Sequence, residues 1–160
     1  GNKEDYNSAK SIEVGNIFPL GTWYAEKMGM TFTDADGKRK PVWFGSYGIG
    51  PTRVMGTWVE VSHDEKGIIW SKEISPFDVH LVGLNGKGYD IYKKLLAKNI
   101  DVLFDDRDIG AGEKFADSDL IGIPIRLVVS DKTDKKIEFK MRNSKVSTLF
   151  DFDEVVKKLI

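Results

Sequence analysis

Arg53 is the residue whose surroundings most clearly indicate chemistry. It follows the run Gly45-Ser46-Tyr47-Gly48-Ile49-Gly50-Pro51-Thr52, and apolar residues at helical spacing come after it, so we expect it in the first turn of a helix. Glycines allow a backbone to approach a ligand closely, a helix N-terminus offers unpaired N–H groups, and a guanidinium can bind phosphate or stack on a flat ring. The stretch fits a site for an anionic ligand or a purely structural glycine turn, and the short motif alone does not separate the two.

A second group of charged residues follows an apolar run in the C-terminal half. Asp105, Asp106 and Arg107 come directly after Val102-Leu103-Phe104, and Lys114 lies at the start of an expected helix. These groups fit either a polar binding loop or merely the solvated end of a strand. The two histidines, His63 and His80, are isolated, and their spacing predicts no metal site. The four tryptophans lie in apolar runs, which favours core packing over stacking on bases: Trp23, Trp43, Trp58 and Trp70.

The composition is that of an ordinary globular protein. Of 160 residues, 41% are hydrophobic and 31% charged, and the net charge of −1 argues against nucleic-acid binding by bulk electrostatics. The absence of cysteine excludes disulfides and thiolate chemistry and fits the cytoplasmic location that we predict. No apolar run approaches the ~20 residues of a membrane span, so no membrane association is expected. The first residue is Gly1, so we expect that the native start lies elsewhere.

The N-terminal part reads as a lead-in followed by short strands and helices. Residues 1–10 are polar and aperiodic, and we expect them to be a mobile lead-in. The apolar patterns then predict a strand over 12–18, which Pro19 ends or confines to an edge position, and a helix over 22–28 with Gly29 as C-cap. A hairpin should join 30–33 to 42–44. The second strand of this hairpin, 42–44, is expected to be buried and to lead into the glycine run.

A polar link over 71–76 ends in a proline, and the pattern changes after it. We therefore predict domains over 11–75 and 76–160. Strands and helices alternate in the second domain, which indicates right-handed crossovers and a parallel sheet of the α/β class. The expected elements are strands 78–84, 102–104 and 125–129, helices 88–98 and 113–121, an antiparallel strand 137–141 and a terminal helix striped by Phe152, Val155, Val156, Leu159 and Ile160.

Three segments in this order resemble the C-terminal half of the prolyl-tRNA synthetases of bacterial type. They are Ile12–Thr22, Gly45–Arg53, and Asp105-Asp106-Arg107 with the following Gly112–Asp117 and Leu120–Pro124. The resemblance covers nearly the whole chain from about Ser11. It implies that residues 11–75 are the last part of a class II synthetase catalytic domain, which is built on an antiparallel sheet. It also implies that residues 76–160 are an anticodon-binding domain with a mixed five-stranded sheet and three helices.

The same resemblance implies roles for residues of the first part. Gly45–Arg53 would be the third signature motif of class II synthetases, in which Arg53 is the catalytic arginine that stacks on adenine and reaches toward the γ-phosphate of ATP. The other ATP-binding residues would be Glu13, Asn16 and Pro51. The proline substrate would lie against Phe18, Ser46, Gly48 and Gly50.

For the second part, the resemblance implies contacts with the anticodon of tRNA(Pro), whose second and third bases are guanines. We expect these contacts from Asp106, Arg107 and Lys114, because arginine and lysine donate to guanine O6 and N7 while aspartate accepts from guanine N–H groups.

Four positions depart from the family pattern. Asn16 stands where histidine is usual, Pro19 where glutamine is usual and Ser46 where cysteine is frequent, while Pro51 precedes Thr52-Arg53. Asn16 and Ser46 keep a polar group of smaller size, which implies a tuned pocket rather than a lost one. Pro51 suits the first helical turn, where its missing N–H would have no partner in any case.

The activity implied is proline–tRNA ligation: ATP with Mg²⁺ activates L-proline, which passes to tRNA(Pro) in a protein that is a homodimer. The other two signature motifs are not found in this sequence, so we expect the 160-residue chain to be inactive in amino-acid activation by itself. The alternative is a non-catalytic tRNA-binding or regulatory relative. The presence of Glu13, Gly48, Gly50 and Arg53 together favours the enzyme, because a vestige has no need to keep ATP contacts.

Overall fold

The computed structural model describes residues 7–160, which form two compact units that divide between Thr57 and Trp58. Each unit is described by itself. Residues 7–10 of the predicted lead-in are exposed and lack regular structure, whereas residues 1–6 lie outside the described part of the chain. No helix within residues 7–160 combines the length and apolar character that a membrane crossing requires.

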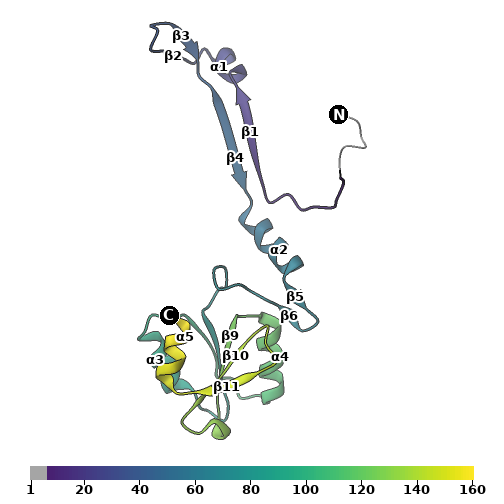
Figure 1. Ribbon diagram of the computed structural model, residues 1–160, viewed down its shortest axis with the longest axis vertical. Coiled ribbons are helices and arrows are strands. Elements are labelled where there is room, and N and C mark those ends of the chain that lie inside the picture. Colours follow the sequence, from purple (N-terminus) through teal and green to yellow (C-terminus); the bar gives the residue numbers. More distant parts are fainter. Residues whose placement is uncertain (1–6) are drawn as a thin grey trace. The chain divides into compact units, whose positions relative to one another are not determined.

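The first unit is built on a two-stranded antiparallel ribbon of β1 (Gly15–Gly21) and β4 (Phe44–Ile49) (Figure 1). Helix α1 (Trp23–Met28) follows β1 and ends at Gly29, whose left-handed conformation (φ 66°) confirms the predicted C-cap. A hairpin of β2 (Thr31–Thr33) and β3 (Arg39–Pro41) leads to β4. Helix α2 (Pro51–Val61) begins in this unit, as the apolar spacing after Arg53 predicted.

Two predictions for this unit were wrong in detail, and a third was confirmed. Val42–Phe44 is not a buried strand, because Trp43 is 71% exposed and β4 begins only at Phe44. The glycine run is itself the strand: its glycines have no positive φ and pair along β1. Of the two outcomes predicted for Pro19, the edge position is the one observed: within residues 7–160 β1 pairs on one side only, with β4, and the pairing register shifts between Pro19 and Gly21. A proline without an N–H is tolerated in such an edge strand.

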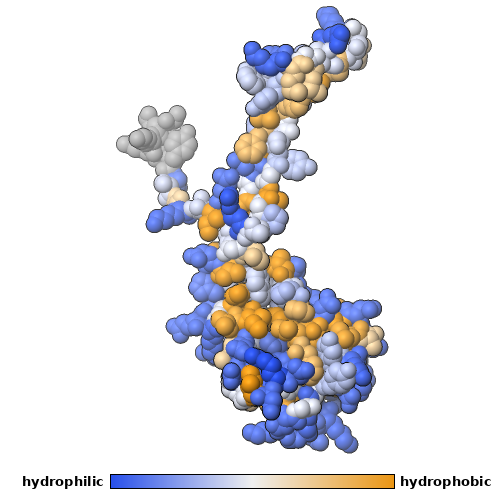
Figure 2. Space-filling model, turned by 180° about the vertical axis from the view of Figure 1, so that it is seen from behind, coloured by the Kyte–Doolittle hydropathy of each residue, from blue (hydrophilic) through white to orange (hydrophobic). Residues whose placement is uncertain are grey.

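The tryptophans divide between the surface and partly buried positions. Trp23 is 58% exposed, so the predicted core packing is wrong for Trp23 and Trp43. Trp58 and Trp70 are half-buried in the second unit, where their indole N–H groups donate to the carbonyls of Ile69 and Ile121 at 3.0 Å each. Apolar residues therefore remain at the surface of the first unit (Figure 2).

A five-stranded mixed sheet organises the second unit, in the order β11-β10-β9-β7-β8. β7 (Val79–Gly83) is parallel to β8 (Val102–Asp105) and to β9 (Ile125–Val129), whereas β10 (Ile137–Met141) is antiparallel to β9, and β11 (Ser147–Phe150) to β10. The α/β class and the mixed five-stranded sheet are thereby confirmed. Periodicity alone had not predicted β11.

The helices cover the two faces of this sheet unequally (Figure 1). α3 (Tyr89–Leu96) and α5 (Phe152–Leu159) pack on one face, where Leu81, Leu95 and Val155 are fully buried in a common apolar core. The stripe predicted for the terminal helix is thus the core face of α5, except at Ile160, which follows the helix and is 83% exposed. A capping box of Asp151 and Glu154 starts that helix. α4 (Ala111–Ile121) covers the other face, and its buried residues are Lys114 and Ser118.

A small hairpin of β5 (His63–Asp64) and β6 (Gly67–Ile68) packs on the C-terminal end of α4. Gly122 caps α4 with φ 81°. It lies so close to β6 that an added Cβ would be 1.9 Å from the Ile68 carbonyl oxygen. The Arg142 guanidinium, which follows β10, pairs with the Asp64 carboxylate at 2.7 Å. The compact unit therefore includes 58–75, and the domain boundary at residue 76 stays a prediction.

Two glycines of α4 are expected to respond oppositely to alanine. Gly122→Ala places a methyl group on the hairpin backbone and strains a left-handed residue, so the free energy of unfolding should fall by at least about 1–3 kcal/mol. Gly112→Ala meets no atom within 4 Å, so it should leave stability unchanged or raise it by up to about 1 kcal/mol. Urea denaturation followed by circular dichroism measures both. Equal stabilities would mean that the hairpin does not hold this position.

Candidate functional site

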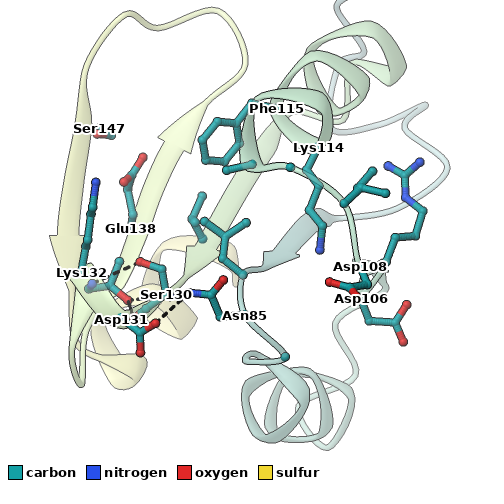
Figure 3. A pocket seen from close by; sticks show the side chains of 18 of the residues that line it. Asn85, Asp106, Asp108, Lys114, Phe115, Ser130, Asp131, Lys132, Glu138 and Ser147 are labelled. Carbon is teal, nitrogen blue, oxygen red and sulfur yellow. Dashed lines mark hydrogen bonds between the residues drawn. The ribbon is translucent and has the colours of Figure 1, made fainter.

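The carboxyl ends of the three parallel strands form the main concave surface of the second unit. β7 connects through α3 to β8 on one side, and β8 connects back through α4 to β9 on the other, so the chain reverses its direction of winding between β7 and β9. Ligand crevices of open α/β sheets lie at such switch points. A cavity of about 990 Å³ occupies this place, lined by the segments that follow β7, β8 and β9 and by residues of β10 and β11 (Figure 3).

A buried carboxylate organises the loop after β8. Asp105, 6% exposed, accepts from Arg107 Nε at 2.9 Å and from Nη2 at 2.8 Å. Arg107 Nη2 also donates to Asp117 of α4 at 2.7 Å. The hydrogen-bonded guanidinium holds the pKa of Asp105 below its usual range, and the two carboxylates raise that of Arg107. The arginine side chain nevertheless stays half exposed, so a ligand can reach its remaining N–H groups.

Lys114 of α4 also lies near the Asp105 carboxylate, on the buried side of the loop. Its side chain is 2% exposed, and Nζ donates to the carbonyls of Gly83 at 2.6 Å and Asp105 at 3.3 Å, and lies 3.8 Å from Asp105 Oδ1. The ammonium thus joins the ends of β7 and β8 to α4. Such a buried cation fixes geometry and has little freedom to reach a ligand directly.

Asp106 lies at the surface of the cavity, beside Asp108 (Figure 3). Within residues 7–160 its carboxylate forms no ion pair. An exposed acceptor therefore stands next to a fixed guanidinium on consecutive residues. This pair can accept and donate hydrogen bonds to one ligand.

Sequence reasoning missed the residues on the opposite side of the cavity. Asn85 follows β7 with φ 55° and donates through Nδ2 to Asp131 Oδ2 at 2.8 Å, while Lys87 pairs with Asp131 at 2.5 Å. The lysine, together with Asn85, lowers the pKa of Asp131. Ser130 and Thr133 form a capping box around the short turn that carries Asp131. The carboxyl-end rule for parallel strands could have identified both loops, had the strand order been known.

The residues predicted for ATP and proline gather on the ribbon of the first unit. Asn16 pairs with Gly48 and Phe18 with Ser46. Opposed residues of an antiparallel ladder share a face, and alternate residues along a strand share it too, so these four positions lie on one face. All four are exposed.

Arg53 is held near the start of this ribbon. Its Nη1 donates to the carbonyl oxygen of Glu13 at 3.0 Å, and Gly50 N donates to the carbonyl of Val14 at 3.1 Å. Pro51 is the first residue of α2, as expected for a first-turn proline. A Cβ added at Gly48 would meet no atom within 4 Å. Packing among residues 7–160 therefore gives no reason for glycine at that position.

Comparison with known proteins gives many relatives of one kind. The chain is 44% identical to the proline–tRNA ligase of Dehalococcoides mccartyi over 97% of its own length, and 46% identical to that of a Sulfurihydrogenibium species over 93%. The proline–tRNA ligase of Exiguobacterium sibiricum is 50% identical over 84% of the chain. The chain spans only 29%, 28% and 25% of the length of these three relatives.

The fold is also found among solved structures. The crystal structure of the prolyl-tRNA synthetase from Cryptosporidium parvum, complexed with L-proline and AMP, superposes with a TM-score of 0.80 over 91% of this chain and 32% of that protein. The sequence identity is 19%, so this comparison concerns the fold. The family model described as an anticodon binding domain matches residues 76–160, the stretch that contains the sheet, its three helices and the cavity at the strand ends. By this match, the chain belongs to the anticodon binding domain family.

Proposed function

We propose that this chain serves a proline–tRNA ligase, reading the anticodon of tRNA(Pro) with its second unit and supplying one wall of the ATP and proline pocket with its first. The observation that carries the proposal is the extent of the similarity. Proline–tRNA ligases match 93% to 97% of the chain at 44% to 46% identity, across both candidate sites. A relative that had kept only the tRNA-binding part would have no reason to resemble these ligases along the ribbon.

The cavity at the strand ends suits splayed single-stranded bases. Proteins read such bases on their edges with side chains held by a rigid sheet. Arg107 is fixed by Asp105 and Asp117 and keeps part of its guanidinium exposed, so it is placed to donate to guanine O6 and N7. Asp106 would accept from guanine N–H groups. Lys114 is buried beneath them, and its ammonium already donates to two backbone carbonyls, so it would act mainly by fixing the loop after β8.

On the ribbon, we assign Arg53 to the nucleotide, with Glu13, Asn16 and Pro51 around it. An arginine suits the role because its planar charged fork can both stack on adenine and bind a phosphate. Phe18, Ser46, Gly48 and Gly50 would line the proline side. The open space at Gly48 supports this assignment, since a glycine that no neighbour requires leaves room for a ligand.

The proposed reaction has two steps. The proline carboxylate attacks the α-phosphate of ATP, which releases pyrophosphate and gives prolyl-adenylate. A terminal ribose hydroxyl of the tRNA then attacks the prolyl carbonyl, and AMP leaves. Arg53 contributes positioning and neutralisation of phosphate charge rather than a covalent bond. Mg²⁺ would enter with ATP, bound to the phosphate oxygens, which are the hard ligands it prefers. The whole ligase is proposed to act as a homodimer.

Arg107→Ala should weaken recognition of the proline anticodon. Loss of a guanidinium that reads a guanine costs about 1–3 kcal/mol, or roughly 5- to 150-fold in affinity, and relaxes specificity at that base. Fluorescence anisotropy would compare a tRNA(Pro) transcript with one whose anticodon guanines are replaced by adenines. Lys98→Ala, at an exposed lysine after α3, is the control. An equal loss on both transcripts would reduce Arg107 to a backbone contact.

Asp105→Asn should lower the free energy of unfolding at pH 7 by about 1–3 kcal/mol, because Arg107 and Lys114 lose their shared charged partner. The folded-state pKa of Asp105 lies below its ordinary value, so its contribution is present above pH ~4 and is lost as the pH falls through the folded pKa. The difference between wild type and variant should therefore shrink below pH ~4. Asp106→Asn, an exposed control, should stay within about 0.5 kcal/mol throughout. A pH-independent difference would contradict the ionic role.

Arg53→Lys should reduce proline-dependent ATP–pyrophosphate exchange in the ligase that carries this chain by about 10²–10³-fold, as expected for loss of one preorganised charge donor. Gly48→Val should also impair exchange by raising the KM for proline, while the circular dichroism of the 160-residue chain stays unchanged. Arg39→Lys, in β3 of the same unit, is the matched control. Unchanged exchange in Arg53→Lys would remove Arg53 from the nucleotide site.

A further inference from the structure

A second polar cavity, of about 340 Å³, lies at the ends of the strands opposite to the first cavity. β10 runs antiparallel to β9, so the end of β10 lies beside the beginning of β9, with Lys140 opposite Arg126 and Met141 opposite Ile125. The cavity of about 990 Å³, which we propose for the anticodon, lies at the other ends of these strands. The second cavity is lined by residues of the β5–β6 hairpin, α4, β10 and the turn that follows it: Asp64, Lys66, Asp119, Lys140, Arg142, Asn143, Ser144 and Lys145.

Both carboxylates of this cavity are already occupied. Asp64 accepts from two nitrogens of Arg142, at 2.9 and 2.7 Å, and from the backbone N–H groups of Lys66 and Gly67. Asp119 pairs with Arg126 at 3.2 Å and with Lys66 at 3.7 Å. Two carboxylates therefore lie among four lining cations, and both carboxylates are already paired with other cations.

Lys140 and Lys145 are the two lining lysines for which the described residues provide no ion pair. Neither ammonium has a carboxylate within 4.0 Å in the part of the chain that the structure describes. Lys145 is exposed, but Lys140 is half-buried on the strand. Burial, followed by the nearby charges of Arg126, Lys66 and Arg142, lowers the pKa of Lys140, and Asp119 opposes this only in part. A half-buried cation among other cations is satisfied by an anion from outside.

We propose that this cavity binds a backbone phosphate of the RNA whose anticodon occupies the cavity at the other ends of the strands, an inference that rests on the proposed tRNA function. Lysine is suited to such a contact, since its ammonium acts as a point charge on phosphate without reading a base. Arg142 and Asp64 hold the hairpin and the β10 end together around the site. The cavity contributes affinity without sequence preference, whereas Asp106 and Arg107 supply the preference.

Lys140→Met tests the proposal, because it keeps the apolar stem and removes the charge. Binding of the tRNA(Pro) transcript to the 160-residue chain would be measured by anisotropy over a series of KCl concentrations. Loss of one phosphate contact should lower the slope of log K against log[KCl] by about 0.7–0.9 and weaken binding about five- to tenfold near 0.1 M salt. The loss should be equal for the transcript with altered anticodon, and Lys140→Arg should restore most of the affinity. Lys98→Met is the control.

Lys145→Met serves as the second variant, since an exposed lysine can be replaced without disturbing the fold, and it should show a smaller loss in the same direction. The proposal is overturned if both variants bind RNA with the affinity and salt slope of Lys98→Met. It is equally overturned if inorganic phosphate perturbs the Lys140 resonances while RNA does not, which would indicate a free-anion site. Anticodon discrimination lost in Arg107→Ala but retained in Lys140→Met separates this site from the proposed function.

Discussion

The Asp105 carboxylate is the group on which the geometry of the second unit's cavity depends. It ends β8, is almost inaccessible to solvent and stands between a guanidinium on its own loop and an ammonium from α4. Buried ion clusters of this kind often contribute little net stability, because desolvation offsets the attraction between the charges. What Asp105 supplies is a defined position for Arg107 and a fixed distance between the strand ends and α4. A lysine in place of Arg107 would lose the two-pronged contact that sets this orientation.

The two faces of the sheet divide stability from chemistry. α3 and α5 cover one face with an apolar core that includes Leu81, Leu95 and Val155. The face under α4 carries polar side chains in positions that normally hold aliphatic ones: His80 is 2% exposed with Nδ1 unpaired in the described chain, and Arg126 stacks on Phe115 at 4.6 Å. Polar contacts depend on direction, so α4 is held in one register by them. The apolar face can then tolerate substitution more readily than the α4 face can.

The sequence predicted elements wherever their periodicity was long enough to exclude alternatives. The stripe from Phe152 to Leu159 and the apolar run Ile125–Val129 are of this kind. β11 has four residues and lies next to a polar turn, so its alternation is too short to identify a strand, and only family resemblance implied a fifth one. The burial of Lys114 could not be predicted, because it follows from carbonyls of Gly83 and Asp105, which only the tertiary fold brings together. The contact between Asn85 and Asp131 could not be predicted for the same reason, because 46 residues separate them in the sequence.

The ribbon of the first unit differs from the cavity in how its geometry is maintained. An isolated two-stranded ribbon is marginally stable in water, and this one exposes Ile17 and Tyr47 on one face and Phe18 on the other. In its proposed proline site, a Cβ added at Gly48 would meet no atom within 4 Å among residues 7–160. A pocket that discriminates a small apolar ring needs rigid walls, since each methylene is worth only ~1–3 kcal/mol. In the proposed function, the ribbon residues would therefore discriminate proline only when both faces of the ribbon are covered, whereas Arg107 is fixed by contacts within its own unit.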